Sequence, residues 1–151
     1  MRLIGWAVIG AAVLVGAVAA YVRLAPSDPA VWHVDPAAAD PGPGRYVVKP
    51  EGGDSAGPLL ATTPQEALAA LDEIARAAPR TEVLAGSVEA GRVTYVARSA
   101  LWGFPDYVTV EAVPAEDGGA RLVIFSRLRF GQDDLGVNAA RVQDWLARLQ
   151  G

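Results

Sequence analysis

The residues best suited to chemistry lie near the C-terminal end of the chain, in and just after the segment Arg121–Phe130. Side chains alternate between the two faces of a strand, and one face of this segment changes from apolar to basic along its length. That face carries Arg121, Val123, Phe125, Arg127 and Arg129. A guanidinium group binds a carboxylate or phosphate through two parallel hydrogen bonds. Arg127 and Arg129 are therefore candidates for an arginine-rich edge that holds an anion or a polar headgroup.

Three further side chains are expected at the same edge. Arg98 ends its own predicted strand, Asp106 follows a Phe-Pro pair, and Asp134 precedes the last predicted helix. The N-terminus of that helix also favours anions. In a purely structural alternative the two arginines only fix the loop, by pairing with Asp106, Asp133 or Asp134.

The chain offers few of the groups that catalysis or metal binding requires. It has no cysteine and one histidine, His33, which excludes thiolate nucleophiles, cysteine metal sites and multi-histidine metal sites. Ser99 and Ser126 have no evident histidine base, so a serine hydrolase is not expected. The oxygen ligands of segment 133–138 lack the spacing of an EF-hand loop. We expect no cofactor or metal and assign no catalytic residue, although Asp106 leaves a general acid or base open.

The N-terminal segment Leu3–Val22 is a run of twenty residues without a charge. A helix of this length spans the hydrocarbon core of a bilayer, about 30 Å at about 1.5 Å per residue. The alternative is a cleaved signal, with Ala17–Ala19 as the cleavage site, but the run is longer than a signal core and Arg23 follows it directly. We favour a retained anchor. Arg2 and the amino terminus weakly favour a cytoplasmic N-terminus and an exported domain.

The composition narrows the range of partners. The net charge is −4 and the isoelectric point about 4.9, so there is no basic field to hold nucleic acid. The expected partners are the membrane, through the N-terminal helix, and an anionic small molecule, a lipid headgroup or an envelope protein. The chain beyond residue 44 is long enough for one hydrophobic core and not for two.

The chain divides into an anchor, residues 1–23, a proline-rich spacer, residues 24–44, and a single globular domain, residues 45–151. Proline fixes φ and restricts the residue before it, so the spacer is predicted to be extended. Its apolar segment Val31–Val34 is expected to dock on the domain. A short strand is predicted over Arg45–Lys49, followed by a glycine-rich loop.

The domain is predicted to be α+β, with one small antiparallel sheet of four to five strands and two helices packed on one face. Thr63, Pro64 and Glu66 form a capping box for a first helix that Pro79 ends. A second helix is expected over Leu135–Leu149 with Asp134 as its cap and Asn138 as the fallback. The predicted strands, joined by glycine-containing loops, are Thr81–Ser87, Arg92–Arg98, Tyr107–Val113 and Arg121–Phe130.

Several short stretches resemble a known family. They are Tyr95–Ser99, Gly103–Tyr107, Phe125–Gly131 and Asp134–Asn138, and together they are similar to domain-of-unknown-function family 1499 of bacterial envelope and plastid proteins. The likeness covers Trp32–Leu149 and implies no activity. Together with the predicted anchor, the resemblance to envelope proteins gives an expected location at a bacterial inner membrane, with one span and a periplasmic domain. Secretion is the alternative, if the N-terminus is cleaved. The motif residues of this family coincide with the predicted arginine-rich edge. They are Arg98, Asp106, Arg127, Arg129, Asp134, Asn138 and Arg141.

Two functional hypotheses follow from these observations. The first is a non-catalytic, membrane-tethered binding or assembly module whose arginine edge holds an anion, a lipid headgroup or a partner protein. The second is a cell-envelope hydrolase that uses aspartate and arginine side chains. We favour the first, because no nucleophile with a base is evident.

Overall fold

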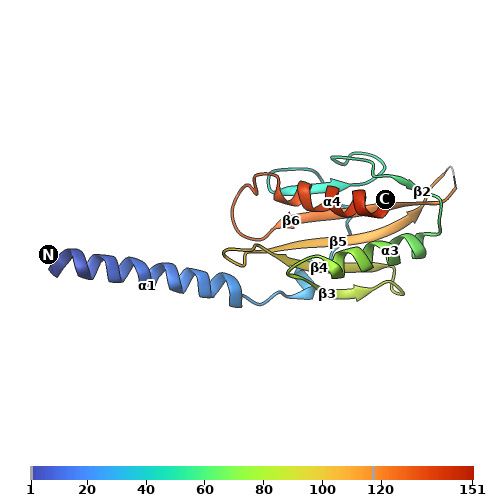
Figure 1. Ribbon diagram of the computed structural model, residues 1–151. Helices are drawn as coiled ribbons and strands as arrows, with labels where there is room; N and C mark the ends of the chain where they lie inside the picture. Colours follow the sequence, from blue (N-terminus) through green and yellow to red (C-terminus); the bar gives the residue numbers. More distant parts are fainter. Residues whose placement is uncertain (1, 117) are drawn as a thin grey trace.

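A long apolar helix projects from a domain built of one sheet and two helices (Figure 1). The computed structural model describes residues 2–116 and 118–151. The projecting helix, α1 (Arg2–Leu24), has the length and hydropathy needed to cross a membrane, a test that a signal sequence also passes. It extends away from the domain, and its side chains from Ile4 onward are almost all exposed.

The strands form one antiparallel sheet in the order β1-β6-β5-β4-β3, with a two-residue strand, β2, also paired to β6. The predicted α+β class and antiparallel sheet are confirmed. The strand β3 is an edge of the sheet, and its register against β4 shifts between Val83 and Ala85, which marks a β-bulge. The bounds are β1 Arg45–Val48, β2 Leu59–Leu60, β3 Thr81–Ser87, β4 Arg92–Arg98, β5 Pro105–Pro114 and β6 Ala120–Leu128.

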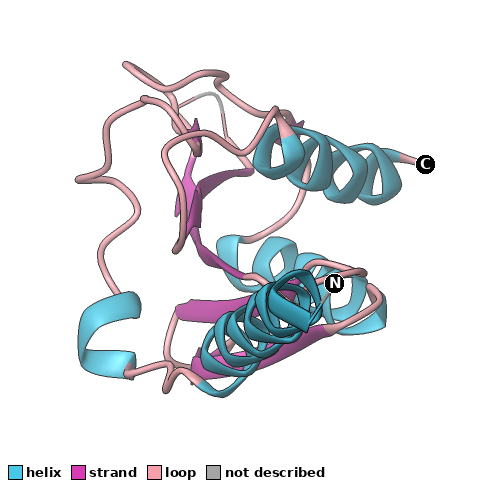
Figure 2. Ribbon diagram, turned by 90° about the vertical axis from the view of Figure 1, so that its left-hand side faces the viewer, coloured by secondary structure: helices cyan, strands magenta, loops and turns pink. Residues whose placement is uncertain are grey.

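Two helices, α3 (Pro64–Ala77) and α4 (Val137–Gln150), cover one face of this sheet (Figure 2). The predicted capping box of α3 is present, with the Thr63 hydroxyl accepting from the Glu66 amide and the Glu66 carboxylate accepting from the Thr63 amide. Between the helices and the sheet lies the main hydrophobic core. Its largest side chains are Leu68, Leu71, Tyr95, Leu122, Ile124 and Trp145, each at most 1 % exposed.

The helix α4 begins at Val137, two residues later than predicted. Gly136 precedes it with φ of 81°, a left-handed conformation that glycine adopts without strain. The predicted cap residue, Asp134, still serves the helix, because its carboxylate accepts hydrogen bonds from the amides of Gly136 and Asn138, the latter at 2.6 Å. The fallback cap Asn138 is inside the helix and fully buried.

The linker, residues 25–44, crosses the opposite face of the sheet (Figure 2). Contrary to the extended prediction, it contains a helical turn, α2 (Pro29–Trp32). Asp28 accepts a hydrogen bond from the Ala30 amide, and Pro29 occupies the first helical position, where its missing N–H costs nothing. The predicted docking of the apolar segment is confirmed, since Val34 packs with Val47 and Phe125 in a second, smaller core.

Candidate functional site

The sheet divides the predicted arginine-rich edge between its two faces. In the pairing of β5 with β6, Asp106 lies opposite Leu128 and Tyr107 lies opposite Arg127. Paired residues share a face and neighbours along a strand alternate, so Asp106 and Arg127 point to opposite sides of the sheet. Asp106 faces the helices, whereas Arg127 faces the linker. The two groups of site residues are therefore separate in space.

On the linker face, Arg127 is 7 % exposed and holds the linker in place. Its guanidinium donates to the carbonyl oxygen of Trp32 and, at 3.3 Å each, to the carbonyl of Phe125 and the hydroxyl of Thr109. It also lies over the Phe125 and Trp32 rings, 4.4 and 5.4 Å from their centroids. Burial, the main influence, lowers the pKa of Arg127 to about 10.

Arg129, one residue beyond the end of β6, also holds the linker. It donates to the carbonyl of Pro26 at 2.9 Å and to the hydroxyl of Tyr107 at 3.0 Å. Among the described residues, neither Arg127 nor Arg129 forms an ion pair, so neither is paired with Asp106 or with the aspartates after β6. The two arginines bind backbone and hydroxyl oxygens that fasten the linker to the sheet.

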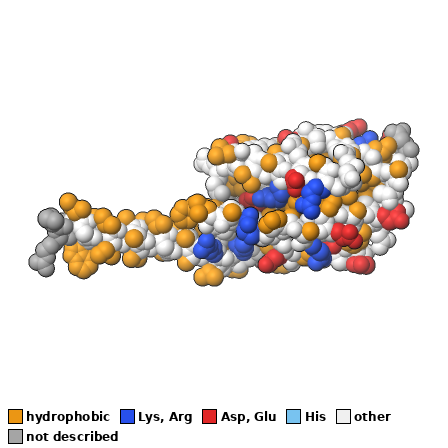
Figure 3. Space-filling view, in the orientation of Figure 1, with side chains coloured by type: hydrophobic (Ala, Val, Ile, Leu, Met, Phe, Trp, Pro, Cys, Tyr) orange, Lys and Arg blue, Asp and Glu red, His pale blue; other side chains and the backbone are white. Residues whose placement is uncertain are grey.

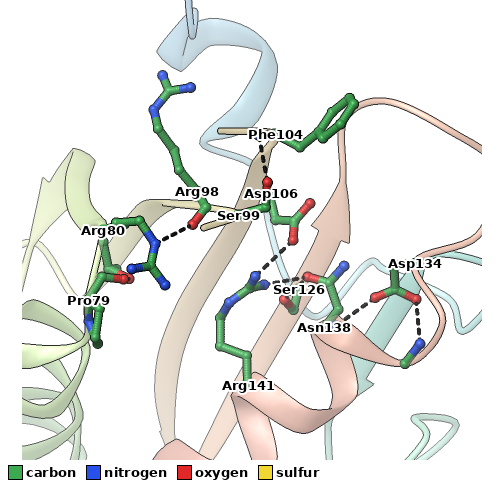
Figure 4. Close-up of polar contacts among 12 residues, drawn as sticks. Pro79, Arg80, Arg98, Ser99, Phe104, Asp106, Ser126, Asp134, Asn138 and Arg141 are labelled. Carbon is green, nitrogen blue, oxygen red and sulfur yellow. Dashed lines mark hydrogen bonds and ion pairs between the residues drawn. The ribbon is translucent and has the colours of Figure 1, made fainter. Parts of the chain in front are cut away.

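On the helix face, Asp106 and Arg141 form a partly buried ion pair. The guanidinium of Arg141 donates to Asp106 Oδ2 and to Asn138 Oδ1, both at 2.8 Å, and Ser126 donates to the same amide oxygen. The side chains of Arg141 and Asp106 are 15 % and 12 % exposed. Figure 4 shows this network joining the start of β5, the end of β6 and the first turn of α4.

Two features of this network are unusual for a purely structural cluster. The amide nitrogen of Asn138 is buried and lacks a hydrogen-bond partner among the described residues, whereas nearly all buried polar groups are paired. The pKa of Asp106 is raised, because burial outweighs the opposing hydrogen bond and charge of Arg141. The network thus contains an unused buried donor and a carboxyl group that is protonated more readily than an ordinary aspartate.

The network borders a pocket of about 380 Å³ between the end of α3, the end of β4 and α4. Arg141, Arg80 and Asp144 are among its lining residues. Figure 4 shows Arg80 and Arg141 extending toward one another from two sides, whereas the guanidinium of Arg98 points away from both. Within the part of the chain that the structure describes, Arg80 and Arg98 have no acidic partner within 4 Å. Arg80 is thus a guanidinium that is directed at the pocket without an acidic partner among the described residues (Figure 4), and such a group suits an anion.

Arg80 is the site residue that the sequence interpretation missed. It lies in the tight connection between α3 and β3 with φ of 56°, a conformation that a residue other than glycine rarely adopts. Its Nε donates to the Arg98 carbonyl at 3.2 Å, which leaves the terminal nitrogens toward the pocket. The only sequence signal was an arginine directly between Pro79 and a strand, and such a signal is weak.

The remaining predicted site residues lie at the border of this arrangement. Arg98 donates from its guanidinium to the carbonyl of Gly103 at 3.2 Å and so braces the β4–β5 loop. Asp134 holds the first turn of α4 and thereby fixes Asn138. His33 lies on the opposite face, where Nδ1 is 2.8 Å from the hydroxyl of Thr94. Within residues 2–116 and 118–151, no three His, Asp or Glu side chains gather to hold a metal ion.

A larger depression, about 680 Å³, opens on the linker face and is lined in part by Trp32, Arg127 and Gln132. Its Arg127 already donates to the carbonyls of Trp32 and Phe125, and the other charged residues there, Asp35, Asp40 and Arg45, carry both signs. We place the candidate site in the pocket beside Arg141, because the Arg80 guanidinium, which has no acidic partner among the described residues, faces it together with the fixed guanidinium of Arg141 (Figure 4). The unpaired amide nitrogen of Asn138 is buried next to it.

Comparison with known proteins gives the family and no activity. A crystal structure of protein MLL2253 from Mesorhizobium loti is similar to this chain, with a TM-score of 0.47 and 16 % identity over 70 % of this chain and 96 % of the other. No curated protein matches the sequence. A family profile described as protein of unknown function (DUF1499) matches residues 26–149, which confirms the resemblance predicted from the motifs. The chain belongs to this DUF1499 family.

Proposed function

We propose that this protein is a membrane-anchored binding module whose pocket between Arg80 and Arg141 takes the anionic group of a small molecule or lipid headgroup. In this proposal α1 spans the inner membrane of a bacterium and the domain lies on the periplasmic side. The apolar length of α1 supports the anchor, and Arg2 and the amino terminus ahead of the run support the orientation.

The observation that carries the proposal is the way Arg141 is held. Asp106 and Asn138 fix its guanidinium through two hydrogen bonds of 2.8 Å, so its orientation is set before any ligand arrives. Arg80 adds a second guanidinium with no acidic partner among the described residues. Two arginines that converge from different elements provide the geometry for a carboxylate or a phosphate.

Binding is favoured over catalysis because the pocket brings no nucleophile together with a base. Ser99 lines the pocket, but its hydroxyl accepts a hydrogen bond from the Phe104 amide, and His33 lies across the sheet. Activation of a serine requires a base within hydrogen-bond reach.

The proposal is tested by native mass spectrometry of the full chain, extracted from membranes and released from detergent micelles. We expect a reproducible adduct on the wild-type protein that is lost from Arg80→Ala, whose side chain is exposed and whose removal leaves the core intact. Arg76→Ala is the matched control, because Arg76 is an exposed arginine on α3 and neither it nor its partner Asp72 lines the pocket. A bare wild-type mass, or an adduct that Arg80→Ala retains, contradicts the proposal.

One observation favours hydrolysis as a second candidate function. The pKa of Asp106 is raised mainly by burial, which is the property of a general acid. In that case the full chain turns over a carboxylate or phosphate ester, and Asp106→Asn abolishes turnover while the protein remains folded by circular dichroism. Equal turnover by Asp106→Asn and wild type removes this candidate.

A further inference from the structure

The loop between β4 and β5, residues 99–104, presents two large apolar side chains to solvent. Leu101 is 74 % exposed and Trp102 is 45 % exposed. The loop is at the end of the domain from which α1 emerges (Figure 1). Exposed apolar side chains that lie together on a loop tip are typical of a surface that contacts a partner or a membrane.

This loop is fastened to the C-terminal end of α1. Arg23 donates from its guanidinium to the Leu101 carbonyl at 3.0 Å. Gly103 has φ of 72°, which favours glycine, and a Cβ at that position would crowd the Arg23 side chain, with Cγ 3.0 Å away. The position of the loop relative to α1 is therefore set by direct contacts.

Trp102 and Phe104 form an apolar groove of about 390 Å³ with α1, which contributes Leu14, Val18 and Val22 among others. The nine residues from Leu14 to Val22 cover about 12 Å along a helix axis, at about 1.5 Å per step. When the uncharged run of α1 fills the hydrocarbon core, this groove lies below the level of Arg23 and inside the leaflet at that end. Lipid chains are then the apolar groups available to fill it.

The charges around the loop fit the same placement. Basic side chains gather where α1 meets the domain (Figure 3), and Arg23, Arg98 and Arg129 all contact the loop, the linker or the end of α1. Arginine side chains at this level reach the phosphate groups of anionic lipids while their stems stay in apolar surroundings. Tryptophan is enriched at the same depth, because one part of its ring system is apolar and its N–H is polar.

We propose that the β4–β5 loop inserts Leu101 and Trp102 into the leaflet at the C-terminal end of α1, so that a bilayer holds the domain at two points. The proposal rests on α1 spanning the membrane and deepens that part of the proposed function. It assigns the occupant of the groove as lipid and is independent of the ligand of the Arg80 pocket.

The chain has no cysteine, so single nitroxide labels test the depth of each position directly. The full chain is labelled at Leu101→Cys, Val13→Cys or Leu59→Cys and reconstituted in vesicles of phosphatidylcholine and phosphatidylglycerol. Val13 lies midway along α1 and reports the span itself, whereas Leu59 is a 46 % exposed leucine in β2, at the far end of the sheet. Accessibility to oxygen and to a water-soluble nickel chelate is measured by electron paramagnetic resonance.

We expect the Val13 and Leu101 labels to be accessible to oxygen and protected from nickel, and the Leu59 label to be accessible to nickel. A Leu101 label as accessible to nickel as Leu59, with Val13 protected, overturns the loop insertion and leaves the anchor intact. A Val13 label exposed to nickel overturns the anchor and, with it, the loop insertion.

Discussion

The ring of Trp32, in the linker, stacks on the ring of Tyr107, in the sheet, with centroids 3.9 Å apart and planes inclined by 12°. The Tyr107 hydroxyl is 2.7 Å from the hydroxyl of Ser27 and accepts from Arg129. The linker is thus held by aromatic stacking, hydrogen bonds and a small core. It connects α1 to the domain as a fixed strut rather than as a flexible spacer.

Removing the stacked ring should release the linker. We expect Trp32→Ala to lower the free energy of unfolding by about 2 kcal/mol, because the change removes apolar contacts and aromatic stacking. The measurement is thermal unfolding of the full chain in detergent, together with the rate of proteolysis in residues 25–44. Val31→Ala is the control, since Val31 is in the same turn and 58 % exposed. Equal proteolysis rates in the two variants would contradict the conclusion that Trp32 holds the linker against the sheet.

The stability of the fold should depend on the planar, forked shape of the Arg127 guanidinium as well as on its charge. Lysine keeps the charge but cannot donate to the Trp32 carbonyl, the Phe125 carbonyl and the Thr109 hydroxyl at once. We expect Arg127→Lys to cost about 2 kcal/mol of stability, because buried acceptors lose their donors. The same substitution at the exposed Arg148 should leave the melting temperature unchanged. A stable Arg127→Lys variant means that charge alone suffices.

The Asp106–Arg141 pair predicts a non-additive double mutant. Arg141→Met leaves a largely buried carboxylate without its partner, at an expected cost of about 3 kcal/mol. Asp106→Asn in the same chain removes that charge and should recover part of the loss. The measurement is a double-mutant cycle by thermal unfolding. Additive losses would show that the two side chains act independently.

The capping box of α3 predicts a dependence of stability on acidity. Hydrogen bonds from Thr62 and Thr63 lower the pKa of Glu66 to about 2 from its ordinary 4.5. A lowered native pKa stabilises the folded state above pH 4.5, and this contribution is lost as the pH falls from 4.5 toward 2. Glu66→Gln should therefore melt below the wild type at pH 7, and the gap should narrow by pH 3. A gap that is constant with pH contradicts this assignment.

The local elements were predictable because their signals are local. The Thr63–Glu66 box needs only four residues, and the apolar positions of both packed helices follow their period directly. The sequence analysis missed the helical turn at Pro29, because the many prolines of the linker were taken to favour an extended backbone. The side chain of Asp28 provides an N-cap that composition does not reveal.

The arrangement of the site was less predictable, because it depends on register. Alternation along β6 correctly placed Arg127 and Arg129 on one face, but no sequence rule gave the alignment of β5 against it. That alignment puts Asp106 opposite Leu128 and thus across the sheet from the arginines. The partner of Asp106 is Arg141, which lies 35 residues further along the chain on α4. Only the family resemblance indicated Arg141 as a site residue.

The β-bulge at Val83 and Ala85 has a consequence for crowding in a membrane. In the proposed arrangement, copies of the chain project from one bilayer on fixed linkers, so their free sheet edges meet at the same level. A regular edge strand would then favour lateral polymerisation into a continuous sheet. The bulge breaks the row of N–H and C=O groups along β3, which opposes the pairing of this edge with a strand of another molecule.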